Sequence, residues 1–406
     1  MGNGSWVEHS IGMKSDAMEH KVYASFAGVE EVRAEWDALV ERVGGDIFST
    51  YDWCRTWWRH YGQRRLLQIH LLRERDQLVA VLPLFWEKQE FGVFAVRLVR
   101  LVGCDHSLTT CSPVIHPDRL SLTVSALIEY LDRHCRWDLL HLGPLPGYYG
   151  QVSGLVNALR GLRQIKSVEL TMDHRGQMVF DLPSTFDAYL ATLTKRERSN
   201  IRRERRDLSR SKSVSHGMLS DPEELGSALG VFISLHQTHW RQKGNLGHFH
   251  DWPRSEEFHR EVAAHQMKLD RLVLTQLRVD DRVLASEYCY RLGDRAHWIL
   301  DGRSREVGGR TPFCEMVKLL MYLGVRQLDA SRGLYEYKRR LGARVLPVHS
   351  ILATAHSGLA AFPARFFRLW SRALDMAYYR LWFSRLAPRV PYLQCPLWPM
   401  WIKSRV

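Results

Sequence analysis

The chain has 406 residues, with 57 Lys and Arg against 44 Asp and Glu, which gives a formal net charge of +13 at pH 7. Hydrophobic residues make up 45% of the sequence and aromatic residues 11%, so there is enough apolar material for a large core. This composition excludes a disordered, collagenous or fibrous protein. At roughly 150 residues per domain, the length predicts two to three domains.

The positive charge is concentrated in two segments. Residues 195–212 carry nine basic and three acidic side chains, and residues 357–406 carry eight basic side chains and one Asp. The remaining 338 residues have no net charge. The basicity is therefore a property of two local surfaces, and each of them needs its own explanation.

Several classes of protein are excluded by simple patterns. No apolar run approaches the roughly 18 residues of a transmembrane helix, and residues 1–21 lack the basic flank and apolar stretch of a signal peptide. The seven cysteines are odd in number and form no C-x-x-C pair, which argues against a disulfide framework or a zinc site. We therefore expect a cytoplasmic protein that holds no metal.

The predicted elements of the first half alternate between helices and strands. Apolar residues at three- and four-residue steps predict helices, and strand-sized apolar runs predict strands. The predicted order is helices over 28–43 and 51–61, strands over 66–73, 77–86 and 95–102, a helix over 117–134, a strand over 137–142, a helix over 151–161 and a strand over 166–171.

The second half repeats this plan. Predicted hairpin turns at Asp76 and Asp281 lie 205 positions apart, which favours two tandem α/β units. The predicted elements are a helix after Thr185, the basic helix 195–210, a strand over 213–218, helices over 222–242 and 254–267, strands over 271–278, 283–292 and 296–301, a helix over 312–323 and a strand over 327–331. The expected divisions are a flexible N-terminus (1–25), an N-terminal domain (26–175), a C-terminal domain (176–355) and a basic aromatic tail (356–406).

The clearest chemical signal is the loop between the strand that ends at Asp301 and the helix that opens at Thr311-Pro312. A loop rich in glycine and arginine before a helix brings together free backbone N–H groups and the positive end of the helix dipole, which suits a phosphate group. Such loops are often simple turns, and that alternative stays open. The candidate phosphate ligands are Arg305, Gly308, Gly309, Arg310 and Thr311.

Short motifs around this loop resemble the GNAT acyltransferase superfamily, in particular its branch of CelD-like and FemA/FemX-like proteins. They are Thr311-Pro312, Asp329 with Arg332-Gly333, and Tyr337-Lys338 with Leu341-Gly342. The basic helix and the segment FSTYDWCRTWW extend the resemblance over roughly residues 30–350. It implies an α/β (α+β) fold of two tandem GNAT-like domains, with mixed sheets flanked by helices, and leaves a C-terminal amphipathic helical tail outside.

The resemblance also implies acetyl-CoA as a co-substrate. In GNAT enzymes the pyrophosphate loop commonly reads Gln/Arg-x-x-Gly-x-Gly/Ala. Residues 305–310 fit this motif except at Arg310, which stands where a small residue is expected. A long side chain there either crowds the pyrophosphate or swings out and binds it.

Acyl transfer to an amine needs a general base, a proton donor for the leaving thiolate and a group that stabilises the oxyanion. Glu287 is a candidate base, because strand alternation places it on the opposite face from Tyr288, but it could instead pair with an arginine. Asp329 ends a strand and is a second candidate, or it caps the following turn. The resemblance assigns Lys338 to the oxyanion or to a phosphate. Tyr337 is a candidate proton donor, or it only packs.

His236 and His239 share one helix face, but no further residue has the spacing of a metal ligand, so surface or capping histidines are expected. No G-x-S-x-G motif or P-loop occurs in the sequence. Serine hydrolase and nucleotide triphosphatase functions therefore lose support.

The two basic segments predict two surfaces. One face of the basic helix carries Arg198, Arg202, Arg205 and Arg206. Such a face suits a phosphorylated ligand or tRNA, or is simply solvated. In the tail, residues 360–406, apolar and basic stripes predict an amphipathic helix that either packs on the protein's own core or lies on an anionic membrane surface. No DNA-binding module is visible, so DNA is not an expected partner.

The resemblance implies an N-acyltransferase that moves an acetyl group from acetyl-CoA to the amine of a small-molecule or lipid-linked acceptor. The resemblance suggests an amino sugar in surface polysaccharide or glycolipid biosynthesis, and a cytoplasmic protein that is peripheral at the inner face of the membrane. The alternatives are a Fem-like transferase that uses aminoacyl-tRNA, and a non-catalytic component of a membrane-associated polysaccharide synthesis complex.

Overall fold

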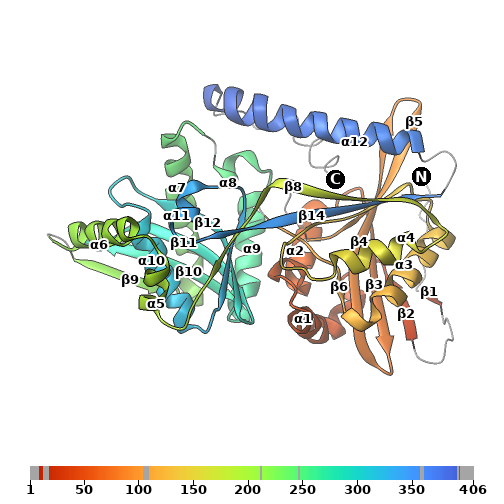
Figure 1. Ribbon diagram of the computed structural model, residues 1–406, viewed down its shortest axis with the longest axis horizontal. Coiled ribbons are helices and arrows are strands. Elements are labelled where there is room, and N and C mark those ends of the chain that lie inside the picture. The colour runs from red at the N-terminus through yellow and green to blue at the C-terminus, as the bar shows by residue number, and fades with distance from the viewer. Residues whose placement is uncertain are drawn as a thin grey trace. The chain divides into compact units, whose positions relative to one another are not determined.

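A computed structural model describes residues 9–11, 18–103, 109–210, 213–245, 247–356, 361–390 and 393. The chain divides into two compact units (Figure 1). Of the described residues, unit 1 holds those within 1–174 and 347–373, and unit 2 holds those within 175–346 and 374–402. Much of the expected flexible segment 1–25 lies outside the described residues, but residues 18–23 of that segment form a strand.

Unit 1 is built on a mixed sheet. Its strands are β1 (His9–Ile11), β2 (Met18–Tyr23), β3 (Leu66–Glu74), β4 (Gln77–Phe91), β5 (Phe94–Leu101), β6 (Val114–Ile115), β7 (Leu139–Leu145) and parts of β8 (Ile165–Asp181) and β14 (Arg344–Ala355). The order runs β1-β2-β3-β4-β5-β7-β14, and β5 and β7 form a parallel pair within this otherwise antiparallel series. Its helices are η1 (Ala27–Val32), α1 (Arg33–Arg42), η2 (Ile47–Ser49), α2 (Tyr51–Tyr61), η3 (Pro117–Arg119), α3 (Leu120–His134) and α4 (Val152–Arg160).

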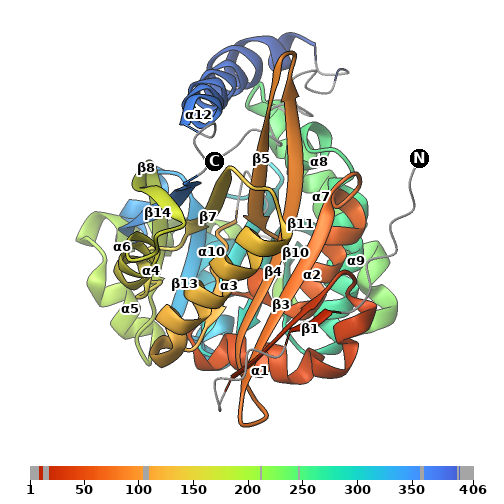
Figure 2. The same ribbon diagram turned by 90° about the vertical axis from the view of Figure 1, so that its right-hand side faces the viewer.

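Helices cover both faces of this sheet. Leu127 of α3 and Leu155 of α4 are buried in one apolar cluster with Leu82 of β4, and Figure 2 shows α3 in front of the strands. On the other face the ring of Trp57 in α2 stacks on Phe85 at 5.6 Å. The alternation of Leu82 and Phe85 between the two faces is the pleat of a strand that is buried on both sides.

Unit 2 repeats this plan. Its strands are β8, β9 (Val214–Met218), β10 (Leu272–Val279), β11 (Arg282–Leu292), β12 (Arg295–Arg303) and β13 (Gln327–Arg332), in the order β9-β10-β11-β12-β13-β8. The pair β12 and β13 is parallel, as β5 and β7 are in unit 1. Its helices are α5 (Phe186–Thr192), α6 (Lys195–Ser209), η4 (Pro222–Glu224), α7 (Leu225–Gln242), α8 (His248–Asp251), α9 (Ser255–Lys268), α10 (Arg310–Tyr322) and α11 (Glu336–Arg340).

Two helical layers also enclose the sheet of unit 2. Ile201 of α6 and Phe313 of α10 are buried with Trp298 of β12 on one face. On the other face Tyr288 of β11 packs against the ring of Phe232 in α7 at 5.2 Å. The predicted α/β architecture of two tandem units is confirmed.

The tandem relation extends to the detail of the two predicted hairpins. Arg75 and Asp76 have φ values of 48° and 66°, and Asp280 and Asp281 have 49° and 64°, as a two-residue hairpin turn requires. Each hairpin also shifts register just before its turn, after Leu72 in β3 and after Leu277 in β10. These shifts are again 205 positions apart, so the two hairpins share a local irregularity as well as a turn.

The tail begins with a long helix, α12 (Ala361–Met376), followed by the π-helical η5 (Ala377–Leu386) and the short η6 (Ala387–Arg389). Phe366 contacts the rings of Phe91 and Phe94 at 5.2 and 5.1 Å, and Phe367 is buried beside strands β5 and β7. This part of the predicted apolar stripe therefore packs on unit 1. Leu369 belongs to the same predicted stripe but is 66% exposed.

The remainder of the predicted tail, apart from Leu393, lies outside the described residues from 391 onwards. None of the helices in the described ranges combines the length and the apolar character needed to cross a bilayer.

Candidate functional site

Two of the predicted catalytic residues, Lys338 and Tyr337, are neighbours on α11 in unit 2, and Glu287 is connected to Lys338 through the ring of Trp298. Lys338 on α11 is 8% exposed, and its Nζ donates a hydrogen bond to the carbonyl oxygen of Ala330 at 2.6 Å. The ammonium lies over the rings of Trp298 and Tyr335, at 5.2 and 4.9 Å from their centroids. Tyr337 is 47% exposed, with its ring centroid 5.9 Å from Nζ. The lysine is thus enclosed by aromatic faces that attract a cation.

Lys338 is charged at neutral pH, but its pKa is lowered by burial. Burial lowers the pKa of Lys338 from 10.5 to about 8, because the charged form loses its hydration. The carboxylates of Asp301, Asp329 and Glu287 act in the opposite direction and favour the protonated form. Lys338 is therefore a cation that can lose its proton only slightly above physiological pH.

Glu287 is the second member of this cluster. It is 4% exposed on β11 and accepts a hydrogen bond from Trp298 Nε1 at 2.8 Å, where an arginine had been the alternative partner. Burial raises the pKa of the Glu287 carboxyl well above 4.5, and the charge of Asp301, its neighbour across the β11–β12 ladder, adds to the rise. Tyr288 faces α7 instead, as the predicted alternation requires.

Asp329 on β13 has a different setting. Leu328 and Ala330 are buried in the cluster beneath α10, so alternation directs Asp329 to the opposite face of the sheet. Its carboxylate accepts hydrogen bonds from Gln177 Nε2 at 2.5 Å and from the backbone N–H of Ser331 at 2.8 Å. The Ser331 contact is the turn-capping role that had been left open. Asp329 acts on Lys338 through its charge rather than by contact.

Sequence reasoning missed Asp301 and Trp298. Asp301 stands directly opposite Glu287 in the sheet and belongs to the strand that leads into the glycine loop, so its place at a strand end was an available signal. Trp298 connects Glu287 to the rings around Lys338, and no short pattern identifies such a bridging residue.

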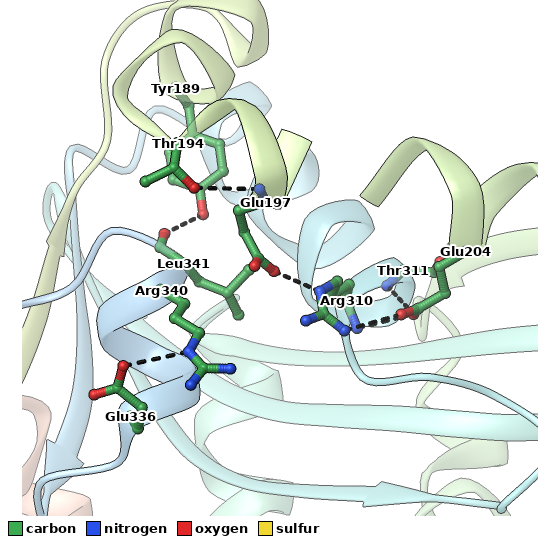
Figure 3. A network of polar contacts seen from close by, with 9 residues as sticks. All are labelled: Tyr189, Thr194, Glu197, Glu204, Arg310, Thr311, Glu336, Arg340 and Leu341. Atoms are coloured by element: carbon green, nitrogen blue, oxygen red, sulfur yellow. Dashed lines mark hydrogen bonds and ion pairs between the residues drawn. The ribbon is translucent and has the colours of Figure 1, made fainter. Parts of the chain in front are cut away.

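The predicted phosphate loop precedes the first turn of α10, and that turn already holds an anion from the chain itself. The backbone N–H groups of Arg310 and Thr311 both donate to Glu204 Oε1 at 2.9 Å (Figure 3). The Arg310 guanidinium turns toward α6, where Nε bonds to Glu197 and Nη1 lies 3.6 Å from Glu204. Arg305 is exposed.

Charged side chains approach both loop glycines closely. A β-carbon at position 308 would clash with the carboxylate of Glu204, and one at position 309 would clash with the guanidinium of Arg303. Any larger residue would therefore push these side chains away from the helix terminus.

Helix α6 presents two chemically different faces. Its inward side carries Glu197, Ile201, Glu204 and Leu208 at four- and three-residue steps. Thr194 begins the helix by accepting a hydrogen bond from the N–H of Glu197 at 3.2 Å. The spacing of the two glutamates with the apolar positions was the sequence signal that could have identified them as inward-facing.

The basic face of α6 is smaller than predicted. Arg202, Arg205 and Arg206 are exposed, but Arg198 is half-buried and donates to the carbonyl oxygen of Leu193 at 2.7 Å. Arg198 therefore satisfies a backbone group at the end of α5 and is held close to the protein.

Of the predicted histidine pair, His236 stabilises the α7–α8 corner. His236 Nδ1 donates to the carbonyl oxygen of Asp301 at 2.6 Å, and Nε2 accepts the backbone N–H of His248 at 3.2 Å. Burial lowers the pKa of His236 to about 4, consistent with a neutral ring. Within the described ranges, no group of three or more His, Cys, Asp or Glu side chains is arranged to hold a metal ion.

Unit 1 contains a separate pocket of about 600 Å³. Aromatic side chains of Tyr23, Trp58, Trp86 and Tyr130 contribute to its wall, together with Arg65. Arg65 is bound to Glu87 at 3.0 Å and is not available as a free cation. The predicted catalytic and phosphate-binding residues do not line this pocket.

Comparison with known proteins identifies the region that holds the cluster. Residues 195–339 match the family model described as an acetyltransferase (GNAT) domain, and no curated protein matches the chain by sequence. The crystal structure of FemX is similar over 79% of this chain and 95% of its own, with 12% identity and a TM-score of 0.56, which shows a shared fold. A tandem GNAT protein from the clavulanic acid biosynthesis pathway is similar over 83% of this chain and 98% of its own, with 13% identity and a TM-score of 0.40.

Proposed function

Through residues 195–339 the chain belongs to the GNAT acyltransferase family, and from this premise we propose that it transfers an acetyl group from acetyl-CoA to an amine. The observation that carries this proposal is the buried cluster of Lys338, Glu287 and Asp301 within the matched region. It combines a cation with a carboxyl group of raised pKa in a site that is largely shielded from water.

The cluster supplies the groups that the reaction needs. The amine nitrogen attacks the thioester carbonyl carbon, and its proton passes to the Glu287 carboxylate, whose raised pKa suits a base that works near neutral pH. The Lys338 ammonium stabilises the oxyanion of the tetrahedral intermediate. The C–S bond then breaks, and the CoA thiolate takes a proton from Tyr337, which is open to solvent on one side.

The acceptor that we propose is an amino sugar of a surface polysaccharide or glycolipid precursor, on the strength of the CelD-like resemblance. The test is mass spectrometry of the products formed from acetyl-CoA and a panel of amino sugars and lipid-linked precursors. Acetylated product from the wild type, lost in Lys338→Met, is the expected result. Lys318→Met is the matched control, because Lys318 also lies over an aromatic ring, that of Phe186, at 4.7 Å. No product with any acceptor, or equal loss in both variants, contradicts the proposal.

A Fem-like reaction with aminoacyl-tRNA is the second candidate, and two observations favour it. The exposed arginines of α6 offer a surface for a polyanion, and the first turn of α10 is taken by Glu204 rather than left open for a CoA pyrophosphate. Parallel reactions with acetyl-CoA and with aminoacyl-tRNA distinguish the two possible donors. Transfer from the tRNA that is lost on Arg202→Glu with Arg206→Glu, and none from acetyl-CoA, selects this candidate.

For location, we propose peripheral attachment to the inner face of an anionic membrane through α12. The helix is anchored on unit 1 by Phe366 and Phe367, while Leu369 and Met376 remain 66% and 52% exposed. Arg365 and Arg372 are exposed on the same stripe, at steps of three or four residues from these apolar side chains. An anchored helix with an outward stripe of arginine and apolar side chains has the composition of an interfacial helix.

A further inference from the structure

The first turn of α10 contacts a carboxylate in the way that such a turn contacts a phosphate. Two successive backbone N–H groups converge on one oxygen of Glu204, and the Arg310 guanidinium lies 3.6 Å from the other. Glu204 comes from a different helix, more than a hundred residues earlier in the chain (Figure 3). The anion is therefore delivered to this position by the packing of α6 against α10, and not by a local cap.

A second observation indicates that this position can bind a group with more acceptor oxygens than the Glu204 carboxylate. Thr311 is 4% exposed, and its Oγ1 is buried without a hydrogen-bond partner among the residues that the structure describes. A buried hydroxyl without a partner is costly, because it has lost its hydrogen bonds to water. A phosphate group has more acceptor oxygens than a carboxylate and could also take the hydroxyl proton of Thr311.

We propose that Glu204 is a displaceable internal anion that competes with the donor's phosphate for the first turn of α10 and so sets the affinity for the donor. The idea rests on the proposed function only in taking the donor to carry a phosphate. Glu204 is 19% exposed, so its side chain has an open path to solvent when a ligand replaces it. Its role is to set the affinity for the donor, and it takes no part in the chemical step.

The expected effect follows from competition. The apparent dissociation constant of a ligand equals its intrinsic value divided by the fraction of molecules in which the site is open, so removing the competitor tightens binding. Hydrogen bonds to a charged group are strong enough to make the change about tenfold or more. Glu204→Ala opens the position, and Glu204→Gln keeps an acceptor at the same place but removes the charge. The predicted order of affinity is Glu204→Ala, then Glu204→Gln, then wild type.

The test is isothermal titration calorimetry of the full chain with CoA and, separately, with inorganic pyrophosphate, at one fixed ionic strength. Glu315→Gln is the matched control. Glu315 is also 19% exposed and also pairs across α6 and α10, with Arg205 at 3.7 Å, but its second contact is with the side chain of Lys318 at 2.8 Å. Adding Thr311→Val to Glu204→Ala should reverse part of the gain in ligand affinity. If Glu204 is only a helix cap and no ligand binds here, Thr311→Val should not change the affinity.

Tighter binding in both Glu204 variants, with Glu315→Gln like the wild type, supports the proposal. Unchanged affinity in Glu204→Gln and Glu204→Ala overturns it and leaves Glu204 as a helix cap. If the alanine variant loses its fold, the glutamine variant decides alone, because it retains the acceptor. Calorimetry measures binding and not catalysis, so the two proposals can fail separately. Tighter binding without acetyl transfer would contradict the proposed reaction and support this role of Glu204. Acetyl transfer with unchanged affinity would support the reaction and contradict this role.

Discussion

Among single residues, Lys338 is buried and yet retains its charge at neutral pH. Its ammonium is bound by one carbonyl group and three aromatic faces, and carboxylates within electrostatic range offset part of the cost of burial. If Lys338 served only to fill space, its replacement by methionine would cost little stability. The position of its pKa near neutrality makes its role open to measurement.

The pH dependence of the reaction should reveal whether Lys338 acts as a cation. With a pKa of about 8, Lys338 is charged below that pH and neutral above it, so kcat should fall as pH rises through about 8. Lys338→Arg retains a charge at higher pH and should lose this descending limb, although at a lower rate. The ratio of the wild-type rate to the Lys338→Arg rate, measured from pH 6 to 10, removes the contribution of the acceptor amine. A ratio that rises through pH 8 would instead assign Lys338 to proton abstraction.

Glu287→Gln should reduce activity while increasing stability. Burial raises the pKa of Glu287 in the folded state, so the folded protein binds a proton more tightly than the unfolded chain, and stability is lost as pH rises above the unfolded value of 4.5. Glutamine keeps an acceptor for Trp298 Nε1 without a charge. We expect a gain in Tm that is larger at pH 8 than at pH 5, with kcat lowered about a hundredfold or more. A variant that is less stable and fully active would show that Glu287 has a structural role.

At the scale of elements, the apolar residues of α12 are divided between the protein core and solvent. The stripe expected to be continuous is split, because Phe366 and Phe367 face unit 1 while Leu369 faces solvent. Arg368, on the predicted basic side, forms an ion pair with Glu169 of unit 1. Deletion of the tail would therefore expose Phe91 and Phe94 as well as remove the proposed membrane-binding face, so point variants are the cleaner test.

Substitution on the outer face of α12 should weaken binding to anionic vesicles. Leu369→Glu with Met376→Glu places two negative charges on the stripe, and co-sedimentation with vesicles containing phosphatidylglycerol should fall to the level seen with neutral vesicles. Leu122→Glu is the control, because Leu122 is 54% exposed on another helix of unit 1. Equal sedimentation of all three proteins, or no difference between anionic and neutral vesicles, would rule out attachment through this face.

Helices and strands were predicted from the sequence more successfully than contacts between residues that are distant in the chain. The helix over 51–61 and the hairpins at Asp76 and Asp281 were recognisable, because periodicity and turn residues are local. Strands β2 and β14 were missed, since their identity depends on partners far away in the chain. For the same reason the loop motif located the first turn of α10, but the carboxylate of Glu204 that occupies it is visible only in three dimensions.

At the scale of the whole molecule, each unit buries a pair of neutral histidines. In unit 1 the rings of His20 and His70 are joined at 3.0 Å, and in unit 2 those of His248 and His259 at 3.2 Å. Burial lowers the pKa of His20 to about 4 and that of His248 to about 3, and their partners are also shifted downward. Both units thus contain groups that resist protonation.

Acidification should destabilise both units before the carboxylates are titrated. Between the unfolded value of 6.5 and about 4, the unfolded chain binds more protons than the folded one, so stability falls as pH decreases through this window. Urea denaturation at pH 7, 6 and 5 should show a falling midpoint. His70→Gln should flatten this dependence for unit 1, and substitution of the exposed His356 by Gln should leave it unchanged. A midpoint that is constant from pH 7 to 5 contradicts the assignment.

The return of β14 to unit 1 has a consequence for biosynthesis. Residues 349–354 pair with β7 at residues 139–145, so the nascent chain exposes the edge of β7 until some two hundred further residues have left the ribosome. The main segment of unit 2 ends at Leu346, so it is synthesised before unit 1 receives this strand. The N-terminal unit therefore stays open while that segment is made, and a premature stop before β14 would damage the half of the protein that was synthesised first.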